Sequence, residues 1–134
     1  MTNEAPADAH WCAGRRQQVL EYLRDQGLAH GAIGDWPAWH LAPYVSIWAI
    51  ESVKAPGRIG WWAICGDLPT DYCSADGCRH PRLAMRTFAH EWRDSAATLR
   101  LGDRPIEPSL AELLAARADV LSEWAADDGL WDAA

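Results

Sequence analysis

The sequence predicts an α+β fold in a single domain, in which about three helices pack with a central antiparallel β-hairpin. Three stretches have the apolar spacing of amphipathic helices, and two adjacent central runs are rich in β-branched and aromatic residues. Helices and strands do not alternate along the chain, so the βαβ units of a parallel sheet are missing. With 134 residues, 49% of them hydrophobic and 23% charged, the chain resembles one globular domain.

The chain is expected to begin with a disordered lead at residues 1–8, followed by one domain over residues 9–131. The first helix is predicted at residues 9–26, where Asp8 is a candidate N-cap and Gly27 a natural stop. Apolar residues at three- and four-residue spacing give this helix one face to bury.

Two neighbouring runs, 44–52 and 58–65, predict the strands of the hairpin. The segment 53–57 between them has the length and composition of a hairpin loop. Both runs are apolar on both faces, so each face of the sheet needs a cover. Helices are expected on one face. The loop 36–39, within a turn-rich stretch at 28–43, is the candidate cover for the other.

A turn at residues 66–72 is expected to lead into a short third strand at 71–74. The second helix is predicted at 81–99, because this segment begins with a proline and carries an apolar stripe. A linker at 102–108 follows, and residues 109–112 have the form of a capping box that opens the third helix.

Tryptophan is unusually common in this chain. Nine residues are Trp, whereas Phe occurs once and Tyr three times, and five of the Trp residues fall within 36–62. An indole buries a large apolar surface but has an N–H that needs a hydrogen-bond partner when it is buried. The centre of the chain is therefore expected to form a core or a cleft with flat, partly polar walls.

The charge and the N-terminal sequence limit the classes of partner and the compartment. With a net charge of −7, the chain is not expected to bind nucleic acid or an anionic membrane surface. No secretory signal is visible, and no segment approaches the roughly 20 apolar residues of a membrane span. We expect a cytoplasmic protein whose four cysteines are reduced, and the abundance of Arg and Ala is typical of a bacterial coding bias.

Three strings, at 36–40, 44–52 and 60–72, resemble a family of short, Trp-rich bacterial proteins that is described as a domain of unknown function. The last string ends in Gly-Asp-Leu-Pro-Thr-Asp-Tyr and is the most distinctive of the three. The resemblance covers about residues 11–131 and implies one complete domain. It implies no activity and no site residues.

A basic stripe along the predicted second helix is the most specific functional signal. Its members recur every three or four residues: Arg79, Arg82, Arg86, His90 and Arg93. Cations near a helix N-terminus oppose the macrodipole, so an anion that neutralises them would stabilise this arrangement. The sequence predicts a carboxylate or phosphate site at Arg79, Arg82 and Arg86. The favoured alternative is internal pairing with the acidic C-terminal segment.

Three titratable residues are the candidate catalytic groups: His40, Asp67 and Asp71. Together with Glu51 they offer the donors of an acid–base pair or of a Mg²⁺ site. Aspartate is also common in tight turns after strands, where it accepts backbone N–H bonds. The structural interpretation is favoured for this turn.

Trp36 and Trp39 are candidate stacking residues for a flat ligand, a sugar or a Pro-rich peptide. The favoured alternative is that both indoles cover the sheet. Cys73, Cys78 and His80 offer part of a zinc site but lack a second pair of ligands nearby. We therefore expect no metal and no cofactor.

These observations favour a small binding protein without catalysis that engages a protein or a small anionic ligand. Two alternatives stay open. One is a small hydrolase or transferase with a Trp-walled cleft. The other is a structural homodimer, in which the basic stripe of one subunit meets the acidic helix of another.

Overall fold

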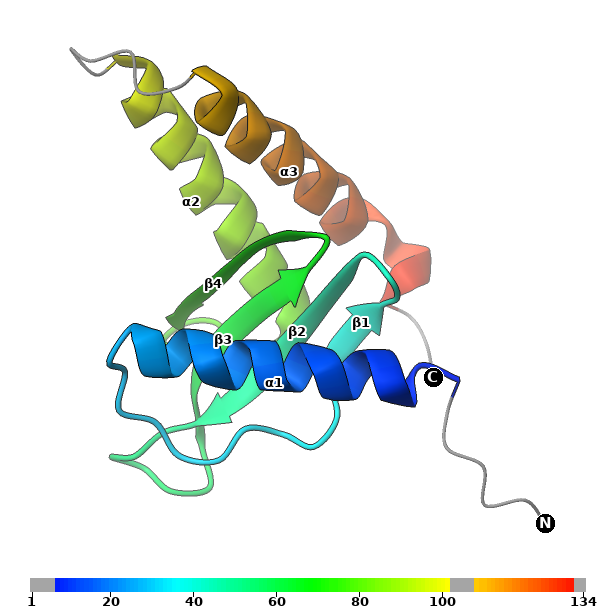
Figure 1. The fold of residues 1–134 in the computed structure, drawn as a ribbon, viewed down its shortest axis with the longest axis vertical. Helices are drawn as coiled ribbons and strands as arrows, with labels where there is room; N and C mark the ends of the chain where they lie inside the picture. Colours follow the sequence, from blue (N-terminus) through cyan, green and yellow to red (C-terminus); the bar gives the residue numbers. More distant parts are fainter. Residues whose placement is uncertain (1–6, 102–107, 132–134) are drawn as a thin grey trace. The chain divides into compact units, whose positions relative to one another are not determined.

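The structure of the chain, a computed structural model, describes residues 7–101 and 108–131. This part of the chain contains three α-helices, a short 3₁₀-helix and a four-stranded antiparallel sheet (Figure 1). The predicted α+β class is confirmed. The residues group into two compact units, Met1–Pro81 with the first helix and the sheet, and Arg82–Ala134 with the two later helices.

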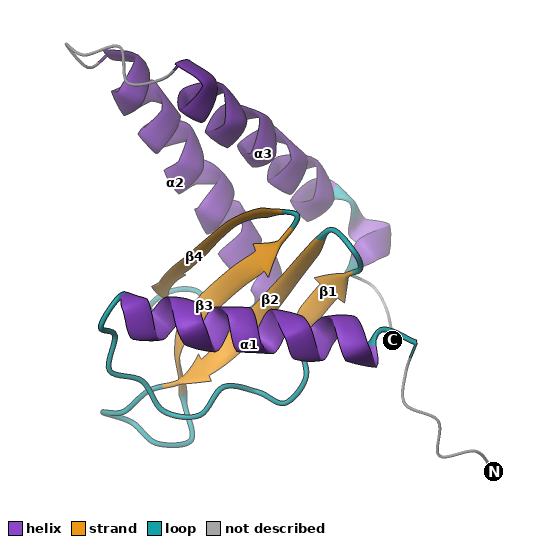
Figure 2. Ribbon diagram, viewed as in Figure 1, coloured by secondary structure: helices purple, strands orange, loops and turns teal. Residues whose placement is uncertain are grey.

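The sheet has the strand order β1–β2–β3–β4, and each strand runs antiparallel to its neighbour (Figure 2). The hairpin of β2 (Val45–Glu51) and β3 (Ile59–Gly66) lies where the sequence predicts it. β4 (Leu68–Ser74) is longer than the predicted third strand, because an edge strand tolerates Pro69, which has no N–H to donate. β1 (Trp39–Leu41) is not predicted, since three residues are too few to show an alternating pattern.

The position of β1 corrects the expected role of the loop 36–39. Trp39 is the first residue of β1 and pairs with Ile47, so its backbone extends the edge of the sheet. Trp36 precedes the strand and is 42% exposed. The expectation that this loop covers a face of the sheet is therefore wrong for Trp39.

Helix α1 (Ala9–Asp25) lies across one face of the sheet (Figure 1). It begins at the predicted residue and ends one residue early, and Gly27 has the left-handed φ of 68° that suits a helix stop. Asp8 is not a side-chain cap, because its carboxylate bonds to His40 instead. The buried core that α1 shares with the sheet consists of Cys12, Val19, Leu23, Ile33, Trp48, Ile50, Ala63 and Cys65.

A small polar network is buried in this core. Trp48 and Ser46 are both fully buried on β2, and the indole N–H of Trp48 donates to Ser46 Oγ at 2.9 Å. Ser46 Oγ in turn donates to the backbone carbonyl of Cys65 at 2.9 Å. The network gives a buried indole the partner that it needs, so a large aromatic residue can occupy a central strand.

The second unit contains α2 (Pro81–Leu101), α3 (Pro108–Ala126) and the 3₁₀-helix η1 (Asp128–Leu130). Both long helices lie where the sequence predicts them. The predicted apolar stripe of α2 is buried at Ala84, Met85, Phe88, Ala89, Trp92 and Ala96. Outside the described residues lie 1–6 of the predicted lead, 102–107 of the predicted linker and the Ser109 side chain of the predicted capping box.

Candidate anion-binding site

The structure does not bring the candidate catalytic residues His40 and Asp71 together. His40 lies on β1 and Asp71 on β4, which are the two opposite edges of the sheet. At roughly 4.8 Å between neighbouring strands, the two backbones are about 14 Å apart. Asp67 is exposed in the turn between β3 and β4. A proton transfer that uses both His40 and Asp71 would need far closer contact than this.

His40 is held by residues of its own unit. Its Nε2 lies 2.9 Å from Asp8 Oδ2. The ring of Trp36 meets the imidazole edge to face at 5.2 Å between centroids, and Trp11 lies at 6.3 Å. The ring of Trp36 therefore already packs against the protein. Stacking of a ligand on Trp36 and Trp39 stays a prediction.

Asp71 also has structural partners. Its Oδ1 accepts a hydrogen bond from the backbone N–H of Tyr72 at 2.8 Å. Burial raises the pKa of the nearby Tyr22 to about 12, and the negative charge of Asp71 adds to this effect. Tyr22 thus stays protonated at neutral pH, and this pair favours a structural role for Asp71.

Glu51, the third carboxylate of the predicted group, organises the hairpin loop. Its two oxygens accept backbone N–H bonds from Gly57 at 2.8 Å and from Ala32 at 3.2 Å. The hydrogen bond from Gly57 has the larger effect and that from Ala32 the smaller, and together they lower the pKa of Glu51 below its ordinary value. The carboxylate thereby ties the loop between β2 and β3 to the strand-like segment at Ile33.

We expect Glu51→Gln to weaken the acid dependence of stability. A lowered pKa in the folded state stabilises the fold above the unfolded-state pKa, and this contribution is lost as the pH falls through the folded value. Urea unfolding should therefore show a smaller loss of stability for the variant than for the wild type between pH 6 and about pH 3, around the ordinary glutamate value. The matched control is Glu123→Gln, at an exposed position of α3. Equal acid dependence of Glu51→Gln and wild type would contradict this role.

Two arginines of the basic stripe pair with acidic residues of the C-terminal segment, and His90 Nε2 lies 3.4 Å from Asp94 Oδ2 on the same helix. Arg82 Nε donates to the carbonyl of Ala125 at 2.6 Å, and its Nη2 lies 2.5 Å from Asp128 Oδ1. Arg93 Nη2 lies 3.0 Å from Asp119 Oδ1. Internal pairing with the acidic C-terminal segment, the alternative raised by the sequence, is therefore confirmed for Arg82 and Arg93.

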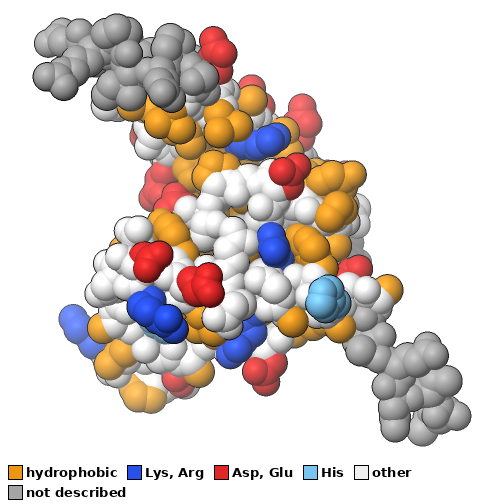
Figure 3. All heavy atoms as spheres, in the orientation of Figure 1, with side chains coloured by type: hydrophobic (Ala, Val, Ile, Leu, Met, Phe, Trp, Pro, Cys, Tyr) orange, Lys and Arg blue, Asp and Glu red, His pale blue; other side chains and the backbone are white. Residues whose placement is uncertain are grey.

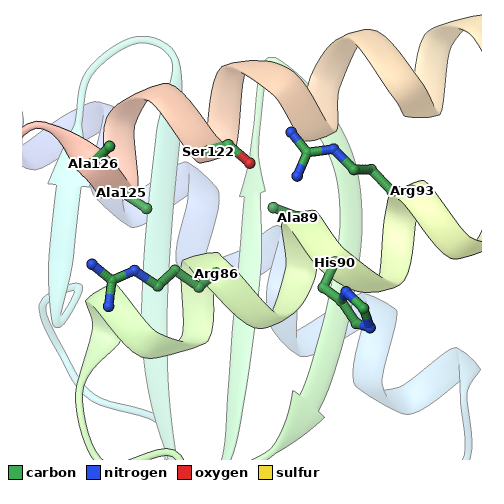
Figure 4. Close-up of a pocket in the computed structure, with 7 residues that line it drawn as sticks. All are labelled: Arg86, Ala89, His90, Arg93, Ser122, Ala125 and Ala126. Carbon is green, nitrogen blue, oxygen red and sulfur yellow. The ribbon is translucent and has the colours of Figure 1, made fainter.

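Three members of the stripe line a shallow recess between α2 and α3, with a volume of about 280 Å³. Figure 4 shows Arg86 and Arg93 on either side of Ala89, while His90 points away from α3. Ser122 and two alanines of α3 complete the lining. The Arg86 side chain forms no hydrogen bond or ion pair with a described residue, so its charge is available to a phosphate or carboxylate group.

A larger groove lies wholly within Met1–Pro81 and holds the predicted anion residue Arg79. Its volume is about 910 Å³, and its charged lining consists of Lys54, Arg58, Asp76 and Arg79. The three cations are exposed, and none forms a side-chain hydrogen bond or ion pair with a described residue. On the face of the molecule shown in Figure 3, acidic and basic side chains are intermingled. The groove is therefore a place where positive charge gathers in a chain of net charge −7.

Hydrogen bonds hold the two walls of the groove in place. On the hairpin side, Ser52 N donates to the carbonyl of Arg58 at 2.9 Å. On the other side, the buried indole of Trp62 donates to the carbonyl of Cys78 at 2.7 Å, next to Arg79. Ala75 N donates to the carbonyl of Gly60 at 3.0 Å and links the walls. The cations thus project from backbone that the sheet positions.

The chain matches the model of a known protein family. Residues 6–131 match the model of a family described as a domain of unknown function, DUF4826. The chain belongs to the DUF4826 family. Comparison with curated proteins and with solved structures finds no match. Membership in DUF4826 agrees with the resemblance drawn from the sequence strings and brings no assigned site residues.

The most distinctive string of this DUF4826 member, 66–72, forms the turn between β3 and β4 and most of β4. Gly66 has a φ of 148°, and a side chain there would collide with the backbone carbonyl of Tyr44. The glycine is thus required by a close approach of two backbone segments. The string therefore has a structural explanation at Gly66.

The same DUF4826 chain contains four buried cysteines, none of them in a disulfide. Within residues 7–101 and 108–131, no group of three or more His, Cys, Asp or Glu side chains is arranged to hold a metal ion. No helix in this part of the chain is long and apolar enough to cross a membrane.

Proposed function

We propose that this protein binds a small anionic ligand in the cytoplasm and does not catalyse a reaction on it. The observation that supports this proposal is the groove, whose charged lining consists of three cations, Lys54, Arg58 and Arg79, and a single acid, Asp76. Acids outnumber bases by 19 to 12 in the whole chain, so the groove reverses the overall charge balance. Cations that lack an internal partner attract an oxyanion both by charge and by hydrogen bonding.

The absence of catalysis is proposed because three of the residues considered for acid–base chemistry, His40, Glu51 and Asp71, have structural partners away from the groove. The carboxylates of Glu51 and Asp71 accept backbone hydrogen bonds, and His40 faces Asp8. None of these three residues lines the groove. A cytoplasmic location is proposed from the four cysteine thiols, which a reducing compartment would preserve.

We expect phosphate to raise the melting temperature of the full chain more than chloride does at equal ionic strength. A ligand that binds only the folded state stabilises it by mass action, and tenfold excess over Kd adds about 1.4 kcal/mol. For a chain of this size that stabilisation corresponds to roughly 5 °C. Differential scanning fluorimetry in matched salts would measure the shift.

The test variant is Arg79→Gln, and the matched control is Arg24→Gln, which removes the same charge at an exposed position of α1. Phosphate also stabilises proteins generally by exclusion, and that part should survive in both variants. The phosphate-specific part should vanish in Arg79→Gln and persist in Arg24→Gln. Identical responses in wild type and both variants would refute the proposed function.

A further inference from the structure

We propose that the groove is specific for a compact aromatic oxyanion, that is, a flat apolar body that carries one phosphate, sulfonate or carboxylate group. This inference rests on the proposed function and names the chemical class of its ligand. The groove combines the three cations with an apolar wall formed by Val53, Ile59 and Trp61. A ligand that contacts both the cations and the apolar wall needs an anionic group and an apolar body.

The apolar wall is exposed to an unusual degree for residues of this type. Val53 is 56% exposed and Ile59 is 45% exposed, and the two residues flank the hairpin loop on either side of its cations. Trp61 is partly buried, and its ring meets Tyr72 edge to face at 5.9 Å between centroids. The contact fixes the indole, so little side-chain freedom remains to be lost when a flat group packs against the wall.

The cations lie on both walls of the groove. Lys54 and Arg58 belong to the loop between β2 and β3, whereas Arg79 follows the turn after β4. One anionic group held between the two loops would be paired with cations from each wall. Asp76 lies on the same side as Arg79, so the lining carries three positive charges and one negative charge. This balance suits a ligand with one or two negative charges better than a polyanion.

The size of the groove argues against an inorganic anion as its only occupant. A volume of about 910 Å³ is near the upper end of the roughly 300–1,000 Å³ typical of sites for small organic ligands. A single phosphate ion would leave the apolar wall in water. An aromatic body of one or two fused rings would cover that wall while its anionic group reaches the cations.

Isothermal titration calorimetry of the full chain with three probes tests the inference: 1-naphthyl phosphate, inorganic phosphate and neutral 1-naphthol. We expect naphthyl phosphate to bind at least about tenfold more tightly than either other probe, because it alone engages both surfaces. Arg79→Gln should lower the affinity for naphthyl phosphate by about tenfold, which is the loss expected when one hydrogen bond to a charged group is removed.

Val53→Ser tests the apolar wall without a risk to the core, because Val53 is exposed. The substitution should lower the affinity for naphthyl phosphate by about threefold to fivefold, because apolar contact area is lost. It should leave the affinity for inorganic phosphate unchanged. The matched control is Leu83→Ser, at another exposed apolar position outside the groove. This control should bind all three probes as the wild type does.

The outcomes separate this inference from the proposed function. If naphthyl phosphate and inorganic phosphate bind equally well, and Arg79→Gln weakens both, the anion site stands and the aromatic specificity is overturned. If 1-naphthol binds as tightly as naphthyl phosphate, the groove is merely apolar and the inference is overturned. If no probe binds, the proposed function fails together with the inference.

Discussion

Trp48→Ala is expected to lower the free energy of unfolding by about 3–5 kcal/mol, the loss typical of large-to-small changes in a core. Trp48 is fully buried on a central strand and belongs to the core that α1 shares with the sheet. Its removal leaves a cavity and deprives Ser46 Oγ of its indole donor. Small domains have only about 5–15 kcal/mol of stability, so the variant should unfold at a much lower urea concentration. Urea titration followed by circular dichroism measures the change.

Two controls separate the parts of this effect. Trp36→Ala removes the same side chain at a site that is 42% exposed, and it should cost less than about 1.5 kcal/mol. Ser46→Ala leaves the ring of Trp48 in place but orphans its N–H, which should cost about 1–3 kcal/mol. Equal losses at Trp48 and Trp36 would show that Trp48 is not part of a packed core.

Gly66→Ala should have the second large effect, a loss of at least about 3 kcal/mol. The backbone at Gly66 has a φ of 148°, which other residues rarely adopt. A Cβ there would also lie only 2.9 Å from the carbonyl carbon of Tyr44 and 3.0 Å from Val45 Cα. Both obstacles are backbone atoms, so relief requires that β2 and β3 move apart.

The control for this substitution, Gly14→Ala, is expected to change the stability in the opposite direction. Gly14 lies within α1, and nothing lies within 4 Å of the position that a Cβ would take. Gly14→Ala should therefore stabilise the chain by about 0.5–1 kcal/mol, because alanine loses less backbone entropy in a helix. Thermal unfolding of the two variants side by side would check both signs. A neutral Gly66→Ala would contradict the close approach of the two strands.

The helices and the hairpin could be predicted because their signals are local. Apolar spacing and proline or glycine at the ends mark α1 and α2 in the sequence, and β-branched runs mark β2 and β3. β1 has no such signal, because its three residues acquire their extended form from pairing with β2. Its existence depends on a tertiary contact that no short window of sequence contains.

The candidate site could be predicted only in part, for a similar reason. Arg79 stands out within the basic stripe, but Lys54 and Arg58 come from a loop more than 20 residues away in the sequence. Antiparallel pairing of β3 with both of its neighbours brings the two loops together. Periodicity also cannot tell a cation that awaits a ligand from one that is paired, which is why Arg82 and Arg79 look alike in the sequence.

The cations of the groove are carried by loops and are exposed, whereas the backbone that carries them is fixed by buried residues such as Trp62. Recognition and folding are therefore assigned to different residues. Exposed side chains can be exchanged at little cost in stability, since surface changes are usually within about 0.5 kcal/mol of neutral. Substitutions at Lys54, Arg58 and Arg79 can therefore change the ligand preference of the groove without a large loss of stability.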